Sequence, residues 1–253
     1  MSYYSNATVA DQVLRWNTKL SLDLPDELAE AIEVYRAIRK VPVNTQPTVT
    51  LSSVTTENAE AKVHELADEL IRIEAVGAEF AATQRAKNRL SESAAGAVIR
   101  QAVAAIPNIV EQLQPQLDEH VRAYIEAVAA LPEKLNSETL VSSGPAAVEA
   151  FAAAQRAAQQ IDAISSWVAN TSLLPGVGNP EPVLRVLQPE NYEQLYRLDE
   201  AHRESGSPGV GTSLIGHVYL TAARLGVPFG INTLAECAEL RRNLELSARQ
   251  HPA

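Results

Sequence analysis

Two stretches of the chain decide its fold: residues 61–80, AKVHELADELIRIEAVGAEF, and residues 117–135, LDEHVRAYIEAVAALPEKL. In both, apolar residues recur at alternating steps of three and four. This spacing places them on one narrow stripe of a helix, the stripe along which helices pack against each other. The stripe residues are Val63, Leu66, Leu70, Ile73, Gly77 and Phe80 in the first stretch, and Leu117, Val121, Tyr124, Val128, Leu131 and Leu135 in the second.

These stretches predict an all-α protein with a long, coiled-coil-like helical hairpin or bundle in its middle. A smaller C-terminal cluster of short helices is expected to follow. Alanine is abundant and aromatic residues make up only 5% of the chain, which suits closely packed helices better than a deep aromatic-lined pocket. Except for Gly77 and Leu135, the stripe residues of both stretches form the predicted interaction seam.

Proline, glycine and serine divide the chain into three predicted segments. Residues 1–53 form short N-terminal helices and an extended linker, and residues 54–170 form the hairpin or bundle. Residues 171–253 form a C-terminal helical subdomain that follows a Pro/Gly-rich loop.

Within the middle segment, a first long helix is expected to run from about residue 55 to about residue 90. Ser91, Ser93 and Gly96 weaken the helical pattern beyond that point. The next helical pattern contains Pro107 and Pro115, which remove backbone donors and clash with the preceding turn, so a kinked or broken helix is expected there.

Composition restricts the location and the partners. The net charge of −10 and the pI near 5.0 disfavour nucleic acids and anionic membranes as partners. The N-terminus lacks the pattern of a signal peptide, and charges interrupt every apolar run before 18 residues, so no membrane span is expected. The sequence thus favours the cytoplasm, or a virion if a phage encodes the chain. Scarce lysine and abundant alanine indicate a GC-rich genome, such as that of an actinobacterium or one of its phages.

A glycine-rich string, GSPGVGTS at residues 206–213, has the spacing of a phosphate-binding P-loop. However, Thr212 stands where that loop has its lysine, and a charged helical pattern precedes the string where a buried strand is required. The string is interpreted as a turn into a helix capped by Thr212. Gly209, Gly211, Thr212 and Ser213 are candidates for a weak anion site at the start of that helix.

Residues 221–242, TAARLGVPFGINTLAECAELRR, resemble a helix-turn-helix. The turn is longer than is usual for that motif, and the would-be recognition helix begins with Glu236 and Glu239, which repel phosphates. Arg241 and Arg242 at its far end are the nucleic-acid candidates. Two helices packed around a Gly-Pro turn are the competing interpretation.

Tyr196 followed by Glu200 is similar to the export signature of type VII secretion substrates of actinobacteria. The resemblance covers five residues and would imply export of the chain. The sequence departs from that pattern because the Trp-x-Gly turn of the small members is missing: Trp167 is followed by Val168 and Ala169.

No arrangement of residues indicates catalysis. The five histidines are scattered, no Glu-x-x-His motif occurs, and the single cysteine, Cys237, has no histidine near it in sequence. No catalytic residue, cofactor or metal is expected. The leading hypothesis is a non-catalytic interaction or assembly protein, of the structural or scaffold-like kind found in phages and bacteria, that binds copies of itself or another protein. The alternatives are a DNA-binding regulator and a small-molecule or anion-binding protein or enzyme that uses the Gly-rich loops.

Overall fold

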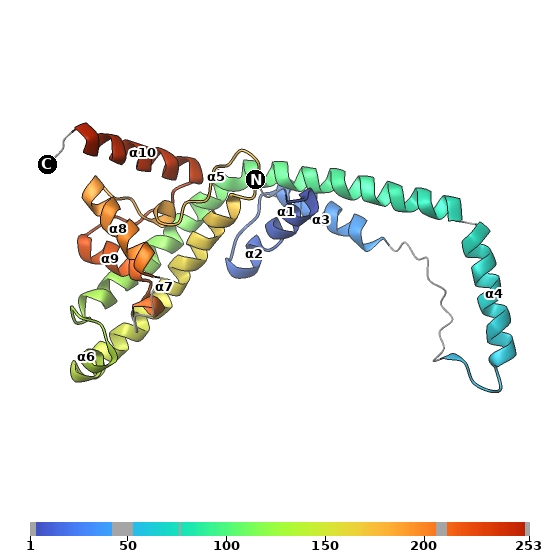
Figure 1. The fold of residues 1–253 in the computed structure, drawn as a ribbon, viewed down its shortest axis with the longest axis horizontal. Helices are drawn as coiled ribbons and strands as arrows, with labels where there is room; N and C mark the ends of the chain where they lie inside the picture. The colour runs from blue at the N-terminus through green and yellow to red at the C-terminus, as the bar shows by residue number, and fades with distance from the viewer. Residues whose placement is uncertain (1–3, 42–52, 76, 206–211, 251–253) are drawn as a thin grey trace.

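The computed structural model describes residues 4–41, 53–75, 77–205 and 212–250, without the side chains of residue 19 and residues 72–81. The predicted all-α fold is confirmed (Figure 1). Among the described residues, the one β-type pairing is an isolated antiparallel bridge between Leu187 and Phe229. The helices are α1 (Asn6–Val13), α2 (Trp16–Lys19), α3 (Asp26–Lys40), α4 (Ala59–Ala75), α5 (Gly77–Ala129), α6 (Ser137–Ser142), α7 (Pro145–Thr171), α8 (Tyr192–Glu204), α9 (His217–Leu225) and α10 (Leu234–Gln250), with short 3-10 helices η2 (Leu184–Val186) and η3 (Ser213–Ile215).

Helix α5 is the axis of the molecule. Its 53 residues follow a path about 80 Å long at the usual rise per residue. Its second half and α7 form the central hairpin, with α6 at the tip (Figure 1). Three alanines of α7, Ala154, Ala157 and Ala158, are buried in this hairpin, and their small side chains suit close helix packing. Ile109 and Leu113 of α5 are completely buried.

The N-terminal helices pack on α5 rather than forming a separate layer. Asp26 and Glu27 in the first turn of α3, and Arg39 and Lys40 in its last turn, oppose the helix dipole favourably. Leu28, Ile32 and Tyr35 of α3 are buried. Together with Val9, Ala10 and Val13 of α1, these residues cover the part of α5 that contains Ala94, Ala95, Val98 and Ile99.

The C-terminal helices pack on the other side of the hairpin, and two buried polar groups anchor them. The hydroxyl of Tyr124 on α5 donates a 2.7 Å hydrogen bond to the carbonyl of Ile215. The side-chain amide of Asn232 donates to the carbonyls of Leu184 and Leu187, at 2.5 and 3.0 Å. These bonds compensate for burying the polar groups and fix the loops around η2 and η3. One hydrophobic cluster includes residues from all three predicted segments, from Val9 to Leu244.

The helix boundaries differ from the sequence expectations in two places. The first long helix ends at Ala75 rather than near residue 90, and α5 continues from Gly77 through Ser91, Ser93 and Gly96. Burial of Ala94, Ala95, Val98 and Ile99 on the same turns supplies packing that outweighs the low helix propensity of serine and glycine.

Of the kink or break expected at Pro107 and Pro115, the break is absent, because both prolines lie inside the continuous α5. Ile106, Ile109 and Leu117 are buried next to them, and this packing holds the helix together through the missing backbone bonds. Figure 1 shows that α5 bends along its course, as a proline-containing helix does.

One apolar window of α5, within Ala82–Ala129, reaches the length and mean hydropathy of a membrane span. Slightly less than half of that window, 44%, is buried inside the structure. Contacts of α5 with α1, α3 and α7 account for apolar residues here without a membrane, since the central helix of a packed body needs the same composition.

Candidate functional site

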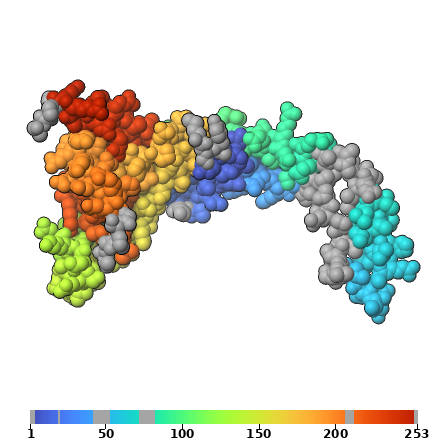
Figure 2. All heavy atoms as spheres, viewed as in Figure 1, coloured from blue at the N-terminus to red at the C-terminus, as the bar shows by residue number. Residues whose placement is uncertain are grey.

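The main candidate site is an arm formed by α4 and the first part of α5. Figure 2 shows α4, in cyan, at the end of this arm, away from the body that contains α7 and α8. Among the described elements, α4 has an appreciable contact only with α5. Its apolar side chains therefore have little to pack against within the described part of the chain.

Three large apolar side chains of α4 are open to solvent. Val63 is 64% exposed, Leu70 44% and Ile71 64%. At 100° per residue these positions fall within about a third of the helix circumference, so they form one apolar face. Leu66 is half-buried, and the side chains of Ile73 and Phe80 lie outside the described part of the structure.

Charges on the arm are divided between its two helices. Helix α4 has five acidic residues and two basic ones, for a net charge of −3. Residues 82–100 of α5 have four basic residues and one acidic one, for a net charge of +3. The basic residues of the second part are Arg85, Lys87, Arg89 and Arg100.

The body covers only one side of this basic stretch. The ammonium of Lys87 donates a 2.7 Å hydrogen bond to the carbonyl of Val41, just after α3. Arg85 and Arg89 are exposed. At four-residue spacing they share the side of α5 that faces away from α3. Leu90, next to that side, is 56% exposed.

The second stripe is inside the body. Leu117, Tyr124 and Val128 are buried, and Val121 and Leu131 are partly buried against the core. The two predicted halves of the interaction seam are therefore not brought together: the second half packs within the hairpin against α7 and the C-terminal helices, whereas α4 of the first half remains on the arm. The spacing of the stripe residues alone does not tell whether a stripe is buried inside the hairpin or lies on the arm.

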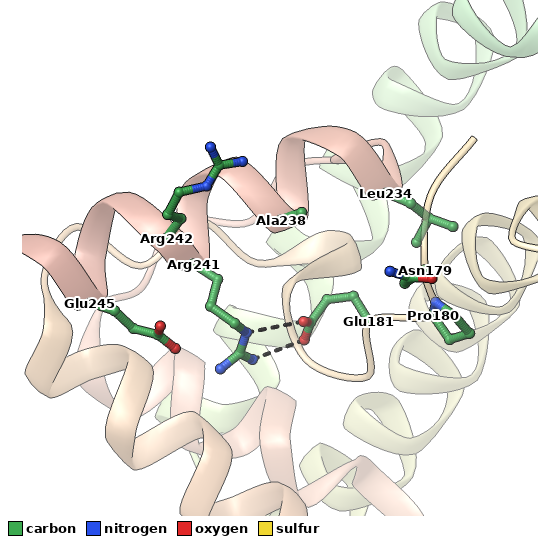
Figure 3. A pocket seen from close by; sticks show the side chains of 8 residues that line it. All are labelled: Asn179, Pro180, Glu181, Leu234, Ala238, Arg241, Arg242 and Glu245. Carbon is green, nitrogen blue, oxygen red and sulfur yellow. Dashed lines mark hydrogen bonds and ion pairs between the residues drawn. The ribbon is translucent and has the colours of Figure 1, made fainter. Parts of the chain in front are cut away.

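Arg241 and Arg242, the nucleic-acid candidates, lie on different sides of α10 (Figure 3). The guanidinium of Arg241 pairs with both carboxylate oxygens of Glu181, at 2.9 and 3.0 Å. It also pairs with Asp199, at 2.7 and 3.0 Å. These charge-assisted bonds raise the pKa of Arg241 still further, despite the opposing effect of its partial burial. Arg242 is exposed and points away from Glu181.

Helices α9 and α10, which correspond to the two helices of the possible helix-turn-helix, pack mainly on other elements. Helix α9 packs mainly on α8, and α10 packs on α8 and η2. A cavity of about 220 Å³ lies beside Arg241, lined by Glu181, Ala238, Glu245 and others (Figure 3). Since two carboxylates already neutralise Arg241, this place offers little attraction to a phosphate.

The Gly-rich string lies mostly outside the described residues, which include neither Gly209 nor Gly211. Thr212 does not cap a long helix as expected. It precedes the three-residue η3, to which its side chain makes no capping bond, and α9 begins later, after Gly216. The N-terminus of such a short helix provides little dipole for an anion.

A second groove, of about 340 Å³, lies between the N-terminal helices and α7. Trp16 and Trp167 meet there edge to face, with ring centroids 5.6 Å apart. The indole nitrogen of Trp167 is buried and has no hydrogen-bond partner in the structure. Since that nitrogen is closed off from solvent, it does not offer the groove a donor.

Other candidates involve single residues. Tyr196 is exposed on α8 one turn from Glu200, which pairs with Arg197 at 3.2 Å. The described residues contain no group of three or more His, Cys, Asp or Glu side chains placed to hold a metal ion.

Comparison of the chain with protein-family models, curated proteins and solved structures found no match.

Sequence reasoning missed two parts of the arm. Ile71 follows Leu70 directly and lies beside the 3–4 stripe rather than on it. The basic stretch around Arg85 and Arg89 was also missed. The signal that would have found it is the change of charge sign between residues 59–75 and 82–100.

Proposed function

We propose that this chain is a non-catalytic interaction or assembly protein that binds a protein partner through α4. One observation carries the proposal: Val63, Leu70 and Ile71 form an exposed apolar face on a helix held away from the body. Single exposed apolar residues are ordinary, but a cluster on one helix face is typical of binding surfaces.

The position of α4 supports the same conclusion. An isolated helix of 17 residues gains little stability by itself in water, since most helices are stabilised by burying an apolar face. A partner helix or groove that covered Val63, Leu70 and Ile71 would supply that burial. Recognition of an amphipathic helix through anchors at this spacing is a common mode of protein–protein binding.

A structural or scaffold-like component of a phage or a bacterium would use such an arm, and the alanine-rich, lysine-poor composition fits that class. The DNA-binding alternative receives no support from the pairing of Arg241 with Glu181 and Asp199. The proposal therefore places function in the arm and assigns the body the role of holding it.

A photo-reactive residue on α4 tests the proposal even when the partner has not been identified. A photo-cross-linking phenylalanine analogue would replace Ile71 on α4, or Arg242 on α10 as a matched exposed control, in cells that naturally produce the protein. We expect a discrete cross-linked product with position 71 but not with position 242. Adding Leu70→Glu should remove that product. Equal labelling at both positions would contradict the proposed function.

A further inference from the structure

We infer that the arm binds the arm of a second copy of this chain, with α4 of each copy lying antiparallel on the first part of α5 of the other. The inference rests on the proposed function and names the partner. It is drawn from the charges and the open faces of the two helices, and from the symmetry that their pairing allows.

The charges of the two helices are complementary. Helix α4 carries −3, whereas the stretch of α5 from Gly77 to Ser93 that would lie along it carries +1, although the chain as a whole carries −10. Two copies would generally repel each other, whereas α4 of one copy attracts this part of α5 in the other. Complementary charges of this kind choose the partner and the register more than they set the affinity.

The open faces are also complementary. In α4, the apolar face of Val63, Leu70 and Ile71 is exposed. In α5, the side away from α3 carries Ala82, Ala86 and Ser93, all exposed, together with Arg85 and Arg89. Small residues let a second helix approach closely, and the arginine stems can cover apolar side chains while their charged ends reach acidic residues.

Symmetry makes the pairing self-consistent. A two-fold axis that passes beside the junction of α4 and α5, parallel to the bisector of the angle between them, exchanges the directions of the two helices. It places α4 of one copy along α5 of the other, and the reverse contact forms at the same time. Such an isologous interface closes on itself and gives a dimer rather than a filament.

The same axis fixes the register. Residues equally far from the junction, on either side of it, come to lie next to each other across the interface. Asp68 of one copy then lies near Arg85 of the other, and Val63 lies near Arg89 and Leu90. The 17 residues of α4 then lie along the first 17 residues of α5, from Gly77 to Ser93.

Charge reversal gives a direct test by light scattering after size-exclusion chromatography at low ionic strength. One variant carries Asp68→Lys, and the other carries Arg85→Glu, which reverses the charge on the other side of the same predicted contact. The wild-type chain of 27.3 kDa should have twice that mass. Each variant alone should be monomeric, with dimerisation weakened roughly tenfold or more. An equimolar mixture of the two variants should restore the dimer, because position 68 of each copy then faces a side chain of opposite charge at position 85 of the other.

Cysteine cross-linking tests the register separately. Val63→Cys with Leu90→Cys should give a disulfide-linked dimer on oxidation. Val63→Cys with Val141→Cys, which places the second thiol on an exposed position of α6, should not. The native Cys237 is buried and does not compete.

Three results would overturn the inference. A monomeric wild-type chain, a dimer unaffected by either charge reversal, or a variant mixture that stays monomeric each contradicts the proposed pairing. If the wild-type chain is monomeric while position 71 still cross-links to a protein of different mass, the proposed function stands and only the self-pairing fails. If position 71 gives no specific cross-link either, both fail.

Discussion

Arg241 joins three separate parts of the C-terminal region. Glu181 lies in the loop after α7, Asp199 lies on α8, and Arg241 reaches both of them from α10. The side chains of all three residues are less than a third exposed. Removing the guanidinium would leave two carboxylates close together in a partly dry place, so the arginine is needed for structure rather than for binding nucleic acid.

Replacing this arginine should destabilise the protein. We expect Arg241→Ala to lower the free energy of unfolding by about 1–3 kcal/mol, since charged groups lose their hydrogen bonds. Arg242→Ala, at the exposed neighbouring position, should change it by about 0.5 kcal/mol or less. Urea unfolding followed by circular dichroism gives both values. Equal effects of the two substitutions would show that the ion pairs contribute nothing specific.

Cys237 gives the protein a pH dependence at alkaline pH. Burial raises the pKa of its thiol from 9.0 to about 12, and Glu181 acts in the same direction. Below pH 9 the thiol keeps its proton in both the folded and unfolded states, so it has no effect on stability. Between pH 9 and 12 only the unfolded state releases the proton, so stability should fall as the pH rises.

The urea midpoint should therefore decrease from pH 9 upward. Burial likewise raises the pKa of Tyr219, to about 12, which adds to the decrease above pH 10. Cys237→Ala should reduce the slope of the curve from pH 9 upward and leave the part of the decrease that the tyrosine causes. An identical slope in the variant and the wild type would exclude the thiol as a cause.

At the scale of the helix, two glycines differ in whether their backbone and surroundings would accept an alanine. Gly96 lies inside α5, and a Cβ there would meet only the Arg100 guanidinium, at an ordinary 3.6 Å. Gly216, just before α9, has a φ of +75°, and a Cβ there would lie 2.5 Å from the ring of Tyr219. Alanine therefore fits the first position and not the second.

We expect Gly96→Ala to raise the free energy of unfolding by about 0.5–1 kcal/mol, because alanine loses less conformational freedom in a helix. Gly216→Ala should lower it by roughly 1–3 kcal/mol, from backbone strain and the steric contact. Thermal unfolding of the two variants measures both effects. A destabilised Gly96→Ala variant would mean that the close approach of another helix, rather than helix propensity, determines this position.

The elements could be predicted from the sequence where local chemistry determines them. A threonine three residues before a glutamate predicts a capping box, and Thr233 and Glu236 form one at the start of α10. Helix α3 starts after Pro25, as its acidic first turn indicates. The continuity of α5 through Gly96 and Pro107 could not be predicted in this way, since it depends on α1, α3 and α7 covering that helix.

The sequence predicted the apolar residues of the candidate site but not which of them would be exposed, because exposure also depends on how distant parts of the chain pack. The spacing of Val63 and Leu70 equals that of Leu117 and Tyr124, because both pairs are seven residues apart on helices. Yet the first pair is exposed and the second is completely buried. Spacing identifies the apolar face of a helix, whereas the path of the whole chain decides whether another element of the same chain covers it.

At the scale of the whole molecule, the chain consists of a well-packed body and a thinly packed arm. The hydrophobic cluster runs through α1, α3, α5, α7 and the C-terminal helices, and no described residue of α4 belongs to it. The free energy of local opening should follow this division, because it depends on how many buried contacts each helix has. Such an uneven distribution suits an arm that becomes fully ordered on binding.

Hydrogen exchange should show this division directly. In the charge-reversed variants, which we expect to be monomeric, backbone amides of α4 should exchange roughly a hundredfold or more faster than those around Ile109 and Leu113 of α5. In the wild-type protein, exchange in α4 should slow as the concentration rises, because pairing with a second arm buries its apolar face. Amides of α8, which lies on the body, serve as an internal control and should not change with concentration. Equal protection of α4 and central α5 in the monomer would mean that α4 packs on the body. That result would contradict the proposal that the arm is the binding element.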